Sequence, residues 1–177
     1  DDPQFDIYGT ETHVLTAQRG LTMGGWFRWS AIANAQGMMS KWITGANQRA
    51  YRLYKNATHN IVFEVSSLGT AASVVSVPST GTVAADVWYH IVGRFVPSTA
   101  LDVYIDAVIT TNAAGVPANI FHSNATFSVG RTDGGSYMNG YTSLMFLSAS
   151  TCWDGAAASR NVIPWALYEH SKRMFNK

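Results

Sequence analysis

Cysteine is almost absent from the sequence: Cys152 is the only one among 177 residues, so no disulfide can form within the chain. Its neighbours are Thr151 and Trp153, and no basic residue stands beside it to lower its pKa, so we expect a packed, unreactive thiol. A domain of this length buries about 70% of the surface that its unfolded chain exposes. The core therefore needs no disulfide, and the lack of one is compatible with an extracellular protein.

Charge is also scarce. Charged residues make up 13% of the chain, against about 25% in an ordinary soluble domain. The net charge is +1 and no basic run is present, so the sequence lacks the positive patch that nucleic acid binding requires. No apolar run approaches the ~20 residues of a membrane span, so we expect no membrane insertion. The chain begins at Asp1 without a methionine, as a trimmed product or a module of a longer protein would.

What the sequence contains in quantity is short segments in which apolar and polar residues alternate. In residues 101–110, for example, Leu101 and Val103 would point to one side of a strand and Asp102 to the other. Groups of Gly, Pro, Asn and Ser separate the segments, which favours an all-β sandwich or barrel over βαβ units. The expected strands are 13–17, 21–30, 37–42, 51–55, 60–66, 73–77, 87–96, 101–110, 125–130 and 141–149.

The last segment, 161–175, predicts one helix instead. Pro164 suits its first turn, where the missing N–H is not needed, and Glu169 and Arg173 stand at the spacing of an ion pair. We find no repeat, linker or low-complexity tract, and expect a single domain over residues 1–177. The helix would dock on the sandwich through its aromatic residues, Trp165, Tyr168 and Phe175.

Two segments, 87–95 and 101–108, resemble the paired strands of laminin G-like domains in the concanavalin A-like lectin/glucanase superfamily. Further segments resemble other parts of that family in the right order: 22–29, 37–42, 127–131, 137–140 and 166–175. The resemblance implies an antiparallel two-sheet jelly roll with a short C-terminal helix. It also implies binding rather than catalysis, at the loop rim or on a concave sheet. Residues 144–150 and the helix further resemble laminin G-like modules of tailed-phage virion proteins.

Many members of that family hold calcium, which prefers six to eight oxygen ligands. Where the family often has Asp-Glu, this chain has Ser143 and Leu144, and the family's Asp-Gly is Asp106-Ala107 here. Asp6 and Glu11 remain as carboxylates near the N-terminus. We therefore expect no metal and no cofactor, with calcium as the open alternative.

Some relatives are glucanases, which need two carboxylates at most about 9.5 Å apart. Asp102 and Asp106 would lie about 13 Å apart on one strand, which is too far. A Ser-His-Asp triad can assemble from distant residues, so His90 beside either aspartate stays an alternative, although no Gly-x-Ser-x-Gly motif is present. We expect no catalytic residues, structural roles for His90 and Asp106, and a core that includes Trp26, Trp29 and Trp88.

Binding of sugars needs an aromatic ring to stack on, together with amides and planar charged groups that form paired hydrogen bonds. The segment 131–139 and the segment 41–49 offer this mixture. The alternative is that their aromatic residues only close the ends of the sandwich. The candidate ligand-binding residues are Trp42, Arg49, Arg131, Asp133, Tyr137 and Asn139.

Three functions fit these observations. The first is a non-catalytic module, outside the cell, that recognises glycans or a partner surface through its loop rim. The second is a structural module of a phage virion, a capsid decoration or tail or fibre domain that binds proteins as a homo-oligomer or within a larger assembly. The third, ranked last, is a glycoside hydrolase. Expected partners are therefore glycans or cell-surface or virion proteins.

Overall fold

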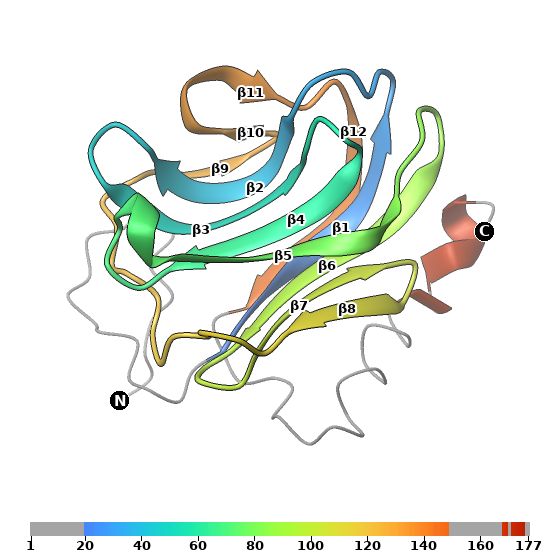
Figure 1. Ribbon diagram of the computed structural model, residues 1–177. Coiled ribbons are helices and arrows are strands. Elements are labelled where there is room, and N and C mark those ends of the chain that lie inside the picture. The colour runs from blue at the N-terminus through green and yellow to red at the C-terminus, as the bar shows by residue number, and fades with distance from the viewer. Residues whose placement is uncertain (1–19, 149–167, 170, 176–177) are drawn as a thin grey trace, which may run out of the picture.

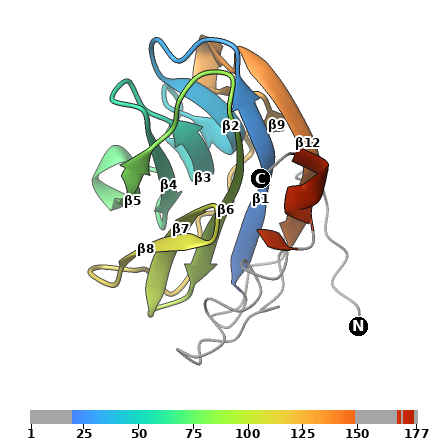
Figure 2. The same cartoon turned by 90° about the vertical axis from the view of Figure 1, so that its right-hand side faces the viewer.

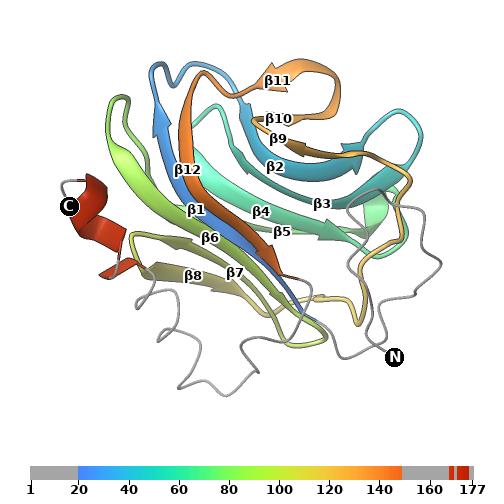
Figure 3. The ribbon, with the colours of Figure 1, turned by 180° about the vertical axis from the view of Figure 1, so that it is seen from behind.

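Two antiparallel sheets of five strands pack face to face in the structure, a computed structural model that describes residues 20–148, 168–169 and 171–175 (Figure 1). Sheet I has the strand order β12–β1–β6–β7–β8, and sheet II has the order β5–β4–β3–β2–β9. The predicted all-β jelly-roll sandwich is thereby confirmed. Figure 2 shows the two layers from the side, and Figure 3 shows them from behind.

The strands begin and end close to the predicted positions. Sheet I consists of β1 (Leu21–Trp29), β6 (Trp88–Val96), β7 (Ala100–Ile105), β8 (Val108–Asn112) and β12 (Gly140–Ser148). Sheet II consists of β2 (Gln36–Ile43), β3 (Gln48–Lys55), β4 (Asn60–Ser66), β5 (Val74–Thr82) and β9 (Phe127–Val129). A two-stranded ribbon follows β9: β10 (Arg131–Thr132), the 3-10 helix η2 (Asp133–Gly135) and β11 (Ser136–Tyr137). Two more 3-10 helices are η1 (Ala71–Ser73) and η3 (Lys172–Phe175).

The inner faces of both sheets supply one hydrophobic core. Period-two alternation turns every second side chain inward, which buries large residues from each layer. Gly93 of β6 shows how closely the layers approach, because a Cβ there would lie 2.8 Å from the ring of Phe63 on β4. The largest residues of this core include Phe27, Trp29, Leu53, Phe63 and Phe95.

A second packed region lies on the outer face of sheet I, the face turned away from sheet II. Trp26 is fully buried there, with its ring centroid 4.3 Å from that of Phe175 and its Nε1 donating to Ser171 Oγ over 2.7 Å. The C-terminal helix lies against this face (Figure 2). Trp26 is therefore buried as predicted, but outside the cluster between the sheets. The prediction that Trp88 lies in the core is wrong, since it is half-buried, 4.8 Å from the ring of Phe175. Trp29 does lie in the core.

The segment predicted as one strand, 101–110, is a hairpin. Strand β7 ends at Ile105, β8 begins at Val108, and the two residues between them, Asp106 and Ala107, have φ of 47° and 67°. Two successive positive φ angles are typical of the tight turns that join antiparallel strands, where Asp-Gly is the usual pair. Because residue 107 is alanine and not glycine, the sequence pattern did not indicate a turn at this position.

Several predictions fall outside the described residues: the strand 13–17, Asp6, Glu11, Cys152 and Trp165. A single domain over residues 1–177 likewise stays a prediction. At the C-terminus, Tyr168, Glu169 and Ser171 are helical, which agrees with the predicted helix. The ion pair formed there differs from the one expected, since Glu169 pairs with Lys172 at 2.5 Å, three residues on, instead of Arg173.

Candidate functional site

The β10–β11 ribbon projects at the edge of sheet II, next to β2 and β9 (Figures 1 and 3). Its base is fixed on β2 by two hydrogen bonds: Gly130 N donates to Met38 O over 2.7 Å, and Ser40 Oγ donates to Arg131 O over 3.0 Å. Gly37 allows the close approach, since a Cβ there would lie 2.1 Å from Thr132 N. The ribbon is therefore a firmly held platform, although its two strands are only two residues long.

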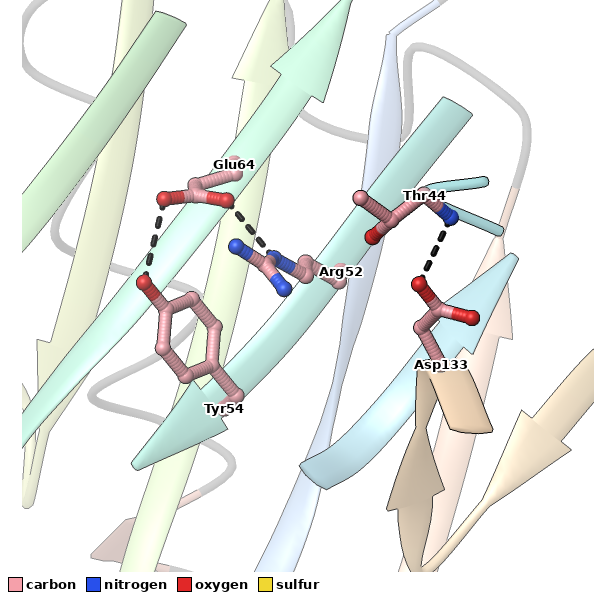
Figure 4. Close-up of polar contacts among 5 residues, drawn as sticks. All are labelled: Thr44, Arg52, Tyr54, Glu64 and Asp133. Carbon is pink, nitrogen blue, oxygen red and sulfur yellow. Dashed lines mark hydrogen bonds and ion pairs between the residues drawn. The ribbon is translucent and has the colours of Figure 1, made fainter. Parts of the chain in front are cut away.

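The tip of the ribbon reaches the turn between β2 and β3. Asp133 Oδ2 accepts a 2.6 Å hydrogen bond from the backbone N of Thr44 (Figure 4). Tyr137 leaves 63% of its surface exposed, and Arg131 is exposed with its Nε donating to Ser128 Oγ over 3.1 Å. Asn139 is exposed, and its backbone N donates to Gln36 Oε1 over 2.8 Å. Arg131, Asp133 and Tyr137 thus lie on the ribbon, which Asp133 helps to hold, and Asn139 lies in the connection from β11 to β12.

The other two predicted residues lie below the surface. Trp42 is 4% exposed and Arg49 is 7% exposed. The guanidinium of Arg49 donates from Nη1 to Asn47 Oδ1 over 2.9 Å and to Gly69 O over 3.1 Å. This geometry gives Arg49 a structural role in holding two loops together.

A polar cluster that the sequence did not predict lies on the outer face of sheet II: Arg52 on β3, Glu64 on β4, and Tyr54 on β3 (Figure 4). Arg52 Nε donates to Glu64 Oε2 over 2.7 Å, and Tyr54 OH donates to Glu64 Oε1 over 3.1 Å. The Arg52 guanidinium carbon lies 4.4 Å from the ring centroids of both Trp42 and Tyr54. We call these four residues the Arg52 cluster. No short motif marks it, because its members stand on three strands.

Burial, and next the charge of Glu64, raise the pKa of Tyr54 to about 12. The phenol therefore keeps its proton at neutral pH and donates it to the carboxylate. This leaves the Arg52 cluster with one positive and one negative charge, so it has no net charge.

The catalytic alternative depended on His90 and the two aspartates of the 101–110 segment. Asp102 is fully buried and its Oδ2 accepts from both Nε and Nη2 of Arg94, over 3.0 and 2.7 Å. Asp106 Oδ1 accepts from the backbone N of His90 over 2.9 Å. Burial lowers the pKa of His90 to about 4, although the charge of Asp106 opposes the shift. Both aspartates are held in structural contacts, as predicted for Asp106. The His90 ring packs 5.4 Å from that of Trp26, while its buried Nδ1 has no hydrogen-bond partner among the described residues.

The donor set at the family's calcium position does not fit that ion. Ser143 is half-buried on β12 and Leu144 is an exposed apolar residue. Within residues 20–148 and the described part of the C-terminal helix, no three His, Cys, Asp or Glu side chains lie close enough to hold a metal together. Calcium needs several carboxylate oxygens, and the described residues do not gather them. In the same part of the chain, no helix has the length and apolar character needed to cross a membrane.

A family model described as the concanavalin A-like lectin/glucanases superfamily matches residues 6–145. The chain belongs to this superfamily. The match includes all ten predicted strands in full or in part, the ribbon and the Arg52 cluster, and it confirms the resemblance to laminin G-like domains. A comparison with curated proteins found no match.

Several solved structures have a similar fold but low sequence identity to this chain. The receptor-binding domain of a botulinum neurotoxin C/D mosaic matches with a TM-score of 0.58 and 11% identity, over 88% of this chain and 37% of that one. The ligand-binding domain of botulinum neurotoxin serotype D, in complex with N-acetylneuraminic acid, gives 0.57 and 10%, over 85% and 36%. A candidate carbohydrate-binding protein from Bacteroides ovatus gives 0.60 and 11%, over 78% and 39%. The chain thus spans little more than a third of each of these structures.

Proposed function

We propose that this domain is a non-catalytic binding module that recognises glycans on an extracellular surface, with the β10–β11 ribbon as part of its contact surface. The observation that carries the proposal is the ribbon itself. It presents Tyr137, 63% exposed, beside the exposed Arg131, on an element that Asp133 fastens to the β2–β3 turn. An exposed ring and planar or amide groups on a rigid support are what sugar recognition requires.

Two further observations support a binding role. The solved structures with this fold include domains described by their binding of N-acetylneuraminic acid or gangliosides, and one described as a candidate carbohydrate binder. In this chain, the aspartates considered for catalysis, Asp102 and Asp106, are held by Arg94 and by the His90 backbone. Protein partners stay an alternative, since a related structure was solved with rat synaptotagmin II.

Within this proposal, three of the six predicted residues, Tyr137, Arg131 and Asn139, are exposed and would contact the ligand.

A glycan array followed by titration calorimetry tests the proposal. We expect saturable binding to at least one glycan, and Tyr137→Ala should weaken it at least tenfold because the stacking surface is lost. Tyr141→Ala is the matched control, since Tyr141 is 59% exposed but lies on β12 of sheet I. Absence of binding across the array, or an equal loss in both variants, would contradict the proposed role of the ribbon.

A further inference from the structure

One row of side chains crosses the outer face of sheet II from edge to edge. The strand register pairs each member with the next: Ser128 with Ser40, Ser40 with Arg52, Arg52 with Glu64, and Glu64 with Ser76. The neighbours of Arg52 along β3, Tyr51 and Leu53, belong to the core, so alternation directs the row outward. The row consists of hydroxyl groups around one central pair of opposite charges.

Arg52 is oriented with unusual firmness for a surface arginine. The rings of Trp42 and Tyr54 each lie 4.4 Å from its guanidinium carbon, and Nε is committed to Glu64. The guanidinium also forms a hydrogen bond with the Tyr54 hydroxyl, which fixes its plane further. The side chains of Arg52 and Glu64 are 22% and 11% exposed. The outer edge of the guanidinium therefore meets solvent as a fixed, planar set of donors.

We propose that the Arg52 cluster is a sugar subsite that binds a neutral sugar residue through two adjacent hydroxyl groups. The inference rests on the proposed function and names its ligand class. A hydroxyl group both donates and accepts, so two neighbouring hydroxyls match a donor and an acceptor that lie side by side. The terminal nitrogens of Arg52 are the donors, and each carboxylate oxygen of Glu64 has lone-pair capacity beyond its one hydrogen bond.

The same pair selects against acidic sugars. A ligand carboxylate only accepts hydrogen bonds, and in this position it would lie beside the negative charge of Glu64, which already neutralises Arg52. Like charges brought together at close range disfavour binding. The cluster therefore distinguishes hydroxyl groups from carboxylates, a preference that the exposed Arg131 alone would not give.

The row also connects the subsite to the ribbon. Arg131 Nε donates to Ser128 Oγ, so this side chain lies over β9 at the edge of the same face. Strands β9 and β3 are separated by β2 alone, which puts Ser128 and Arg52 about 10 Å apart. A short oligosaccharide can extend over this distance, with one residue at Arg52 and another toward the ribbon.

Titration calorimetry with paired probes tests the subsite. Suitable probes are N-acetyllactosamine and its sialylated form, and mannotriose and a galacturonic acid trimer. We expect a neutral probe to bind at least tenfold more tightly than the acidic probes. Arg52→Lys should lower that affinity at least tenfold, because lysine lacks the planar pair of terminal donors. The matched control is Arg28→Lys, since Arg28 also pairs with a carboxylate, Asp86 at 3.0 Å, but lies on sheet I.

A second measurement needs no substitution. In the unchanged protein labelled with ¹⁵N, the neutral probe should shift the Arg52 Nε–H and Trp42 indole resonances. Binding that is lost in Tyr137→Ala but unchanged in Arg52→Lys, with both resonances unmoved, would overturn the subsite and leave the ribbon proposal intact. Preference for an acidic probe would overturn the selection by hydroxyl groups. Absence of binding to every glycan would overturn both proposals.

Discussion

Each sheet carries an arginine–carboxylate pair on the outer faces of adjacent strands, with an aromatic ring beside the arginine, yet the two pairs differ in their access to solvent. In sheet I, Arg94 and Asp102 are 1% and 0% exposed. In sheet II, Arg52 and Glu64 are 22% and 11% exposed. The same chemistry therefore has two surroundings: the buried pair joins strands away from water, while the other pair remains partly in contact with solvent.

The buried pair joins three strands. Asp102 of β7 accepts from Arg94 of β6 through Oδ2 and from Thr111 Oγ1 of β8 over 2.7 Å through Oδ1. Both partners lost their hydration on folding, so each depends on the other for compensation. Arg52 and Glu64 depend less on each other, because both side chains remain partly in contact with water.

The largest expected effect is in the buried pair. Asp102→Ala should lower the free energy of unfolding by about 3–5 kcal/mol, since it leaves the Arg94 charge buried without a partner. The matched change in sheet II, Glu64→Ala, should cost only about 1–2 kcal/mol because Arg52 can be solvated. Urea unfolding of both variants measures the difference, and equal losses would remove the distinction between the two faces.

The pH dependence of stability tests a second buried group on the outer face of sheet I, His90 of β6. His90 is 3% exposed, and burial lowers its pKa from 6.5 to about 4. As pH falls below about 6.5, the unfolded chain takes up the proton first, so stability is full above that pH and declines until about pH 4. The shift corresponds to about 3 kcal/mol.

His90→Gln isolates this contribution, because the variant has no proton to bind at that position. Between pH 6.5 and pH 4 its free energy of unfolding should fall by about 3 kcal/mol less than that of the unchanged protein. Parallel curves for the two proteins would show that His90 is not responsible.

The smallest expected effect concerns backbone geometry in sheet I. Ala107 has a φ of 67° in the β7–β8 turn, a conformation that costs an L-residue about 1–2 kcal/mol and costs glycine little. After the greater flexibility of glycine in the unfolded chain is subtracted, Ala107→Gly should stabilise the domain by about 0.5–1 kcal/mol. Thermal and urea unfolding measure the change.

The control for this substitution is Ala114→Gly, at a position that is not among the residues with positive φ. There glycine should give no gain. A loss of stability in Ala107→Gly, or equal gains in both variants, would show that the strain at residue 107 is not what limits the turn.

The alternation of apolar residues predicted eight strands as single elements, within three residues at every end but one, because burying one face of a strand imposes a period of two. It did not separate β7 from β8, since Asp106 and Ala107 continue the pattern while the backbone reverses. The tight turn needs positive φ angles at Asp106 and Ala107, and neither residue is the glycine that usually marks such a turn in a sequence. The Asp-Gly that the family has in place of Asp106-Ala107 is a pair typical of such turns, and it was the available signal.

The candidate site was predicted in part. The ribbon residues stand within nine positions of one another, so a local segment of sequence brings them together. The Arg52 cluster needs the register of β2, β3 and β4, including the shift between Lys41 and Trp42, before its members meet. Trp26 was predicted correctly as buried, but the sequence did not show which face of its sheet it lies on, because hydrophobicity alone does not distinguish the core from a face covered by a helix.

By itself, the sequence determined the class of fold, the order of the strands along the chain and the aromatic, hydroxyl-rich character of the ribbon. These follow from local patterns and from a resemblance spread over the whole chain. Only the tertiary structure decided which of two similar arginine–carboxylate pairs is buried and which meets solvent. The physical reason is that exposure depends on what packs against a face, and this is set by contacts between segments far apart in the chain.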